Sequence, residues 1–194
     1  KESDMSTVVL LVVLAVLVLW VIGAYNGLVS LKNQVINGWK QIDVQLKRRH
    51  DLIPNLVNTV KGAMDFERST LDAVISARNR AVSATGVRQT AQAEGELTQA
   101  LGRLFALTEA YPDLKATGNV AALQEELTST ENKIGFARQL YNDVATQYNT
   151  KQMQFPTNLI AGLAKASPAE LWEIEDAGER AVPVVDLSLN KPGS

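Results

Sequence analysis

The apolar positions form one uninterrupted run near the N-terminus and then a series of helical stripes. Residues 8–24 read VVLLVVLAVLVLWVIGA, and no charged residue occurs from Met5 to Leu31. A helix rises about 1.5 Å per residue, so roughly 20 apolar residues cross the ~30 Å hydrocarbon core of a bilayer. The run therefore predicts a membrane anchor, represented by Val8, Leu11, Leu14, Leu17, Trp20 and Tyr25.

A cleaved signal peptide and a buried core helix are the alternatives to a retained anchor. A signal peptide needs a basic leader and small residues before its cleavage site. Here Lys1 is offset by Glu2 and Asp4, and Ile22 disrupts the best small-residue site at Ala24. A core helix would not need so long an apolar run. We therefore favour a retained anchor in contact with membrane lipid.

Basic residues lie mainly on the C-terminal side of the run, as Lys32, Lys40, Lys47, Arg48 and Arg49. Loops rich in Lys and Arg stay on the cytoplasmic side of a membrane. This asymmetry favours a membrane protein with its N-terminus outside and its body in the cytoplasm.

A helical stripe follows the anchor at spacings of three or four, formed by Leu28, Leu31, Val35, Trp39, Ile42 and Leu46. The spacing predicts an amphipathic helix over 26–50 that continues the anchor. We expect Asp51 to cap a further segment with Pro54 in its first turn, which would kink the chain there. That segment should reach about Ala84.

Thr85 and Gly86 should end that helix, and Leu97 to Tyr111 mark the next one. A turn is expected over 112–119. The clearest pattern runs from Leu123 to Tyr148, alternates every three and four residues, and should end at Phe155–Pro156. One or two further turns are expected within 158–165, and an acidic, loosely held tail from Ser167.

The predicted fold class is therefore all-α, with an N-terminal transmembrane helix continuing into an antiparallel bundle of three long helices and a short C-terminal helix. We divide the chain into a leader and span (1–25), a bundle (26–166) and a tail (167–194). The helices after residue 50 match one another in length, which leaves the stripe of 26–50 without an obvious partner in the chain except the C-terminal residues. We expect this stripe to pack against other copies and make a homo-oligomer.

Charge and composition exclude several functions. The net charge is −2 and there is no cysteine, so neither general nucleic-acid attraction nor a thiolate zinc site is indicated. His50 is the single histidine and no glycine-rich phosphate loop is present. We expect no cofactor, no metal and no catalytic residue. Charged residues on the helical stripes, namely Glu67, Arg78, Glu131 and Arg138, are interpreted as an interhelix polar network.

The sharpest charged feature is the run Lys47, Arg48, Arg49 and His50. It has two readings: cations that complement the dipole at a helix C-terminus, or an interaction patch for an acidic segment of a partner protein.

Four segments resemble the LemA family of bacterial membrane proteins: YNGLVSLKNQVINGWKQIDVQLKRRHDLIPNLVNTVKG (25–62), YPDLKA (111–116), LQEELTSTENKIGFARQLYNDVATQYN (123–149) and FPTNLIA (155–161). The resemblance implies one transmembrane helix, a bundle of long helices and no known enzymatic activity. It carries over no catalytic residue, and one branch of the family takes part in building magnetosome membranes. The sequence departs from the family pattern after Ala161.

Two functions follow as hypotheses. The first is a self-associating, non-enzymatic membrane protein that organises, scaffolds or shapes the bilayer. The second is a membrane-anchored adaptor for one membrane-protein partner, such as a protease or a signalling protein.

Overall fold

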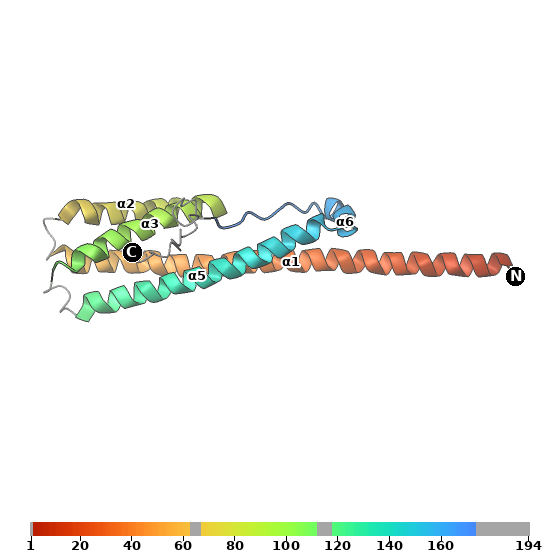
Figure 1. The fold of residues 1–194 in the computed structure, drawn as a ribbon, viewed down its shortest axis with the longest axis horizontal. Helices are drawn as coiled ribbons and strands as arrows, with labels where there is room; N and C mark the ends of the chain where they lie inside the picture. The colour runs from red at the N-terminus through yellow and green to blue at the C-terminus, as the bar shows by residue number, and fades with distance from the viewer. Residues whose placement is uncertain (1, 63–66, 112–117, 174–194) are drawn as a thin grey trace, which may run out of the picture.

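The computed structural model describes residues 2–62, 67–111 and 118–173, and within these ranges it contains helices and no strand. The helices are α1 (Glu2–Lys61), α2 (Arg68–Ser83), α3 (Val87–Thr108), α5 (Gly118–Met153) and α6 (Thr157–Leu163). In Figure 1, α2, α3 and α5 lie along the C-terminal half of α1, while its N-terminal part extends alone. The predicted all-α class is confirmed.

The N-terminal part of α1 is bare. Its large apolar side chains from Val8 to Leu19 are 48–69% exposed. No other helix is as long and apolar among the described residues, and its most apolar window has none of its residues buried. A soluble fold would cover such a surface, because exposed apolar area is costly in water.

The C-terminal part of α1 corrects two expectations. The helix continues through Pro54 to Lys61, so Asp51 lies inside it and caps no following segment. The segment predicted over 51–84 is instead two helices, because α2 begins at Arg68 and runs back along α1 (Figure 1). Apolar spacing continues from Val60 to Leu71, so periodicity alone does not reveal the break.

A side chain of α2 replaces the helical hydrogen bond that Pro54 removes from α1. Proline has no N–H, so the carbonyl of His50 one turn earlier loses its usual helical donor. Arg78 Nε donates to this carbonyl oxygen at 3.2 Å. A side chain from a neighbouring helix thus supplies the hydrogen bond that the backbone of α1 cannot make.

The distal core joins α1, α2, α3 and the start of α5. Its fully buried members include Leu56, Val60, Val74, Leu97 and Leu104. Gly86 separates α2 from α3 with φ 80°, a left-handed conformation that favours glycine. The predicted break at Thr85–Gly86 is therefore confirmed. Most of the turn predicted over 112–119 lies outside the described residues, and Gly118 already belongs to α5.

Helix α5 runs antiparallel to α1 with a fixed register. A Cβ placed on Gly38 would lie 3.4 Å from Tyr141 Cα, so the absence of a side chain lets the two helices approach closely. Farther along, Arg49 of α1 reaches Glu131 of α5. Each step toward the N-terminus of α1 therefore matches one step toward the C-terminus of α5. The predicted end of this helix near Phe155–Pro156 agrees with the observed end at Met153.

The short helix predicted within 158–165 is present as α6. It ends where Lys165 adopts φ 47°, with Ala166 N–H donating to Ala161 O and Lys165 N–H to Gly162 O. This is a Schellman motif, which closes a helix and reverses the chain direction. The chain then returns along the bundle, as Figure 1 shows.

The returning segment is fixed by side-chain amides of α5. Asn149 Oδ1 accepts from Ala169 N–H at 2.7 Å and its Nδ2 donates to Ala169 O at 2.9 Å. Asn142 makes the same pair of bonds with Trp172, at 2.8 and 3.0 Å. We call residues 166–172 the strap. The expectation of a loosely held tail from Ser167 is wrong for this part, while residues 174–194 lie outside the described residues.

Candidate functional site

Three features of the chain are candidates for function: the apolar span of α1, the ionic cluster where α1 meets α3 and α5, and a groove between α1 and α5. The predicted anchor residues Val8, Leu11, Leu14 and Leu17 are exposed around α1. Trp20 and Tyr25, at the end of the run, are 41% and 46% exposed. The geometry therefore leaves the whole apolar run available to lipid.

The stripe of 26–50 is covered within the chain itself. Leu28, Ile42 and Leu46 are 0–3% exposed. Leu28 packs with Tyr148 of α5 and Ala161 of α6, and Leu31 and Val35 lie against the same cluster. The expectation that only the C-terminal residues could cover this stripe is wrong in part, because α5 also extends along it. The C-terminal residues contribute Ala161 of α6 and Ala169 of the strap.

Trp39 lies at the centre of an aromatic cluster rather than between copies. Its ring centroid is 5.7 Å from that of Tyr141, edge to face, and 5.9 Å from that of Trp172 in the strap. Arg138 stacks on the outer side, with its guanidinium carbon 5.5 Å from the Trp172 ring centroid. Arg138 was predicted to join Glu131 in a polar network; it instead makes this cation–π contact with the strap.

The fold buries part of the basic run of α1 and leaves the rest of it on the surface. Arg49 is buried, and its Nη1 lies 2.7 Å from Glu131 Oε2 and 3.3 Å from Glu94 Oε2. Its Nη2 donates to Thr98 Oγ1 at 2.7 Å. His50 Nε2 lies 2.6 Å from Glu94 Oε1. We call Arg49, His50, Glu94, Thr98 and Glu131 the ionic cluster.

Arg48 and Lys47 remain on the surface. Arg48 Nη2 lies 2.6 Å from Glu126 Oε1, with both side chains about half exposed. The acidic partner expected for the basic run is therefore supplied by α3 and α5 of the same chain. Arg49 and His50 are not available to a partner protein, so the predicted interaction patch is wrong for these two residues.

The remaining members of the predicted polar network are separated in space. Glu131 belongs to the ionic cluster and Arg78 binds the His50 carbonyl next to it. Glu67 lies apart, as the residue before α2, and makes no side-chain cap. Glu94 was not predicted as a site residue. It lies one heptad before Leu101, however, and therefore on the buried stripe of α3.

Two tyrosines beside the stalk have altered acidity. Burial raises the pKa of Tyr141 above its ordinary value of 10.0, and the nearby Glu170 carboxylate adds to the rise. Burial also raises the pKa of Tyr148. Tyr141 Oη donates a hydrogen bond to Glu170 O at 2.7 Å. The protonated phenol therefore helps to fix the strap on α5. These groups stay neutral at physiological pH and act structurally.

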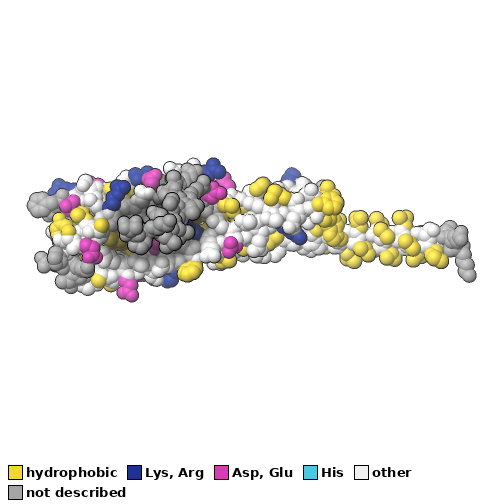
Figure 2. Space-filling view, in the orientation of Figure 1, with side chains coloured by type: hydrophobic (Ala, Val, Ile, Leu, Met, Phe, Trp, Pro, Cys, Tyr) yellow, Lys and Arg dark blue, Asp and Glu magenta, His cyan; other side chains and the backbone are white. Residues whose placement is uncertain are grey.

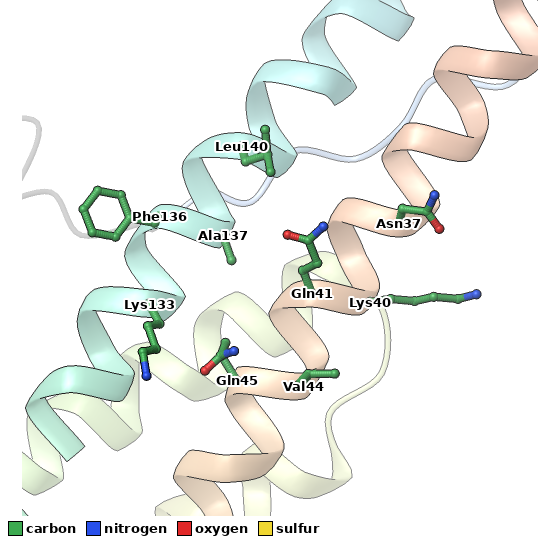
Figure 3. Close-up of a pocket in the computed structure, with 9 residues that line it drawn as sticks. All are labelled: Asn37, Lys40, Gln41, Val44, Gln45, Lys133, Phe136, Ala137 and Leu140. Atoms are coloured by element: carbon green, nitrogen blue, oxygen red, sulfur yellow. The ribbon is translucent and has the colours of Figure 1, made fainter. Parts of the chain in front are cut away.

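An open groove of about 640 Å³ runs between α1 and α5 (Figure 3). Phe136 is 75% exposed, Val44 63% and Leu140 47%, so its edges are apolar. Gln41 and Gln45 extend from α1 toward α5, and Gln45 Oε1 is buried without a hydrogen-bond partner in the described structure. Two cations, Lys40 and Lys133, also line the groove.

Within the described ranges, no group of three or more His, Cys, Asp or Glu side chains is arranged to hold a metal ion. Carboxylates of the ionic cluster are each engaged by Arg49 or His50. The arrangement fixes the register of α1, α3 and α5 and supplies no free acid–base pair.

Fold and surface together define a class of protein: a helical bundle built on one long helix whose N-terminal part is apolar enough to cross a membrane. The sequence profile of the LemA family matches residues 38–187, and the chain belongs to the LemA family.

Curated relatives agree with this assignment. Protein LemA of Metamycoplasma hominis is 29% identical over 142 residues, which is 72% of this chain and 64% of that protein. Magnetosome protein MamQ 2 of Paramagnetospirillum magneticum is 24% identical, over 85% of this chain and 70% of its own length. MamQ of Magnetospirillum gryphiswaldense is 22% identical, over 81% and 68%. The chain thus spans just under two thirds of the Metamycoplasma relative.

Proposed function

We propose that this chain is a single-span, non-enzymatic scaffold of the bacterial inner membrane that organises the bilayer by holding a rigid bundle at a fixed height. One observation carries the proposal: α1 runs without interruption from exposed apolar residues into the bundle core. A helix without a break transmits orientation, whereas a flexible linker would not. The names of the MamQ relatives, which are magnetosome proteins, support a role at a membrane-bounded structure.

The orientation in this proposal follows from charge. Lys32 and Lys40 lie on α1 beyond the apolar run, and both are exposed. Under the positive-inside rule, these charges support a bundle in the cytoplasm and an N-terminus outside.

Self-association belongs to the proposal, but through a different surface from the stripe. The groove edge formed by Val44, Phe136 and Leu140 is an apolar surface that the described part of the bundle leaves uncovered between α1 and α5. Spans fix every copy at one height, so a two-fold axis along the membrane normal brings this edge of one copy to the same edge of another. Lys40 and Lys133 have long stems that can move their charges aside.

The test uses the full chain reconstituted into vesicles. We expect the wild type to form ordered particles or to change vesicle size, and Phe136→Asp to remove this effect. Ser69→Asp, at an exposed position in the first turn of α2, is the control and should behave as the wild type. Dispersed monomers on unchanged vesicles with the wild type would contradict the proposal.

A second candidate, the adaptor function, is favoured by the cations of the groove. Lys40 and Lys133 flank an apolar surface, which suits an amphipathic helix with acidic edges from a partner protein. Replacing both lysines by Glu should then abolish binding of such a helix, with the oligomeric state unchanged. Loss of self-association in the same variant, without a change in partner binding, would favour the scaffold.

A further inference from the structure

Exposed apolar side chains gather at the end of the bundle nearest the span. Phe155, Met153 and Leu159 are 80%, 73% and 64% exposed. We call these three residues the apolar foot. Figure 2 shows hydrophobic side chains at this end of the body, where the bare helix emerges. Apolar groups exposed together in this way usually mark an interaction surface.

The antiparallel register fixes the height of the foot. Gly38 lies against Tyr141, and continuing the register to Met153 brings the matched position of α1 to Asn26. The turn at Phe155 is then level with Ala24 and Tyr25, where the apolar run ends. The foot therefore lies at the depth of the headgroup boundary when the run spans a bilayer.

Helix α6 is held firmly in this position. Thr157, Ile160 and Ala161 are buried toward the bundle, and Ala161 contacts Leu28 of α1. Leu159, on the opposite side of α6, is turned outward. The foot is thus presented on a packed element, and its exposure does not arise from a loose end.

Charges near the foot are of one sign. No Asp or Glu occurs in residues 26–42 or 144–169, whereas Lys32, Lys151 and Lys165 lie in these ranges and are exposed. Apolar residues beside lysines are typical of surfaces that lie in the interface of an anionic membrane.

We infer that the apolar foot inserts into the headgroup region of an anionic leaflet, with Lys32, Lys151 and Lys165 contacting lipid phosphates. The bundle then meets the bilayer at two places, the span and the foot. This inference rests on the proposed membrane anchoring by α1. The occupant is lipid rather than a second copy, because the foot is continuous with the span and level with its end.

The test exploits the absence of cysteine in this chain. Single spin labels are placed at Phe155→Cys and Leu159→Cys in the full chain, reconstituted into vesicles of phosphatidylcholine and phosphatidylglycerol. Collision rates with oxygen, which enters lipid, and with a water-soluble nickel complex report the depth of each label. Val82→Cys is the matched control, because Val82 is 54% exposed on α2, and α2 contacts α1 at His50, about 38 Å beyond Tyr25 by the helical rise.

We expect labels at positions 155 and 159 to collide mainly with oxygen, at interfacial depth, and the label at 82 to collide mainly with nickel. Labels at 155 and 159 that resemble the control would overturn the inference. Protection that disappears when the protein is diluted into excess lipid would also overturn it and assign the foot to a second copy.

Leu14→Cys, within the span, separates this inference from the proposed function. A deep label at 14 with aqueous labels at 155 and 159 would overturn the foot alone. An aqueous label at 14 would overturn the anchoring as well. In vesicles of phosphatidylcholine only, the labels at 155 and 159 should lie shallower; an unchanged depth would overturn the role of the lysines.

Discussion

At the scale of single residues, the ionic cluster shows how the same basic run serves two environments. Arg48 and Arg49 are adjacent in sequence, but one is half exposed and the other is 3% exposed. A buried charge deprived of its partner keeps its full desolvation cost, whereas an exposed ion pair contributes little. The two arginines therefore contribute differently to the free energy of unfolding, although their side chains are the same.

Arg49→Met should lower the free energy of unfolding by about 3–5 kcal/mol, because Glu94 loses a charge partner inside the bundle. Arg48→Met should cost at most about 1 kcal/mol, since its ion pair with Glu126 is exposed. Urea unfolding of both variants measures the difference. Equal costs would show that Arg49 is not the buried centre of the cluster.

Arg78 and Pro54 form a second residue-scale pair. Arg78→Met should lower the free energy of unfolding by about 1–3 kcal/mol, because the His50 carbonyl is left without a donor. In a Pro54→Ala background, residue 54 regains the N–H that can satisfy this carbonyl, so Arg78→Met should cost less. A double-mutant cycle by urea unfolding measures the coupling, and strictly additive costs would contradict it.

At the scale of elements, the strap is the part that periodicity could not reveal. Residues 166–172 form no helix or strand, and their backbone is paired by Asn142, Asn149 and Tyr141 of α5. Asn142 and Asn149 occupy outer positions of the heptad pattern and resemble ordinary solvated residues, whereas Tyr141 belongs to the buried stripe. The pairing is a long-range contact, so no local pattern predicts it.

Tyr141 makes the strap sensitive to alkali. The unfolded chain releases the phenolic proton near pH 10, while the raised pKa keeps Tyr141 protonated in the folded chain. The folded state then binds more protons, so the free energy of unfolding should fall as pH rises above about 10. Urea unfolding between pH 8 and 11 should show a shallower fall for Tyr141→Phe. Parallel curves for the two proteins would contradict this.

Most helices were predictable, and the reasons for the exceptions are specific. The anchor, the ends of α3 and α5 and the presence of α6 follow from apolar spacing, Gly86 and Pro156. The break after Lys61 was missed because the apolar stripe continues across it, although Lys61 followed by Gly62 is typical of a helix C-terminus. Pro54 was expected to mark a boundary, but tertiary compensation by Arg78 keeps the helix intact. Interhelix partners such as Glu94 depend on register, which the sequence of one helix does not contain.

At the scale of the whole molecule, α1 is one continuous helix that connects the apolar run to the bundle. Gly23 and Gly27 lie in it at the exit from the apolar run, and neither has another group within 4 Å of where a Cβ would be. No close contact requires glycine at these positions. Rigidity where the apolar run ends therefore depends on the hydrogen bonds of α1 itself and not on packing at these two positions.

A flexible Gly-Ser insertion between Tyr25 and Asn26 should uncouple the bundle from the span. A donor dye at Asn58→Cys lies about 50 Å beyond Tyr25 along α1. In vesicles containing acceptor lipids, the wild type should show weak energy transfer with a narrow lifetime distribution, and the insertion should increase and broaden it. Equal distributions for both proteins would show that α1 is not a rigid connection.

Under the proposed anchoring, an unbroken α1 would also make the protein responsive to bilayer thickness. A membrane thinner than the apolar run is accommodated by tilting of the span. Because Lys61 lies 36 residues beyond Tyr25, a tilt of about 20° would carry the distal tip of the bundle roughly 18 Å sideways. A change of a few ångströms in bilayer thickness would thus displace the distal end of the bundle sideways by a distance several times larger.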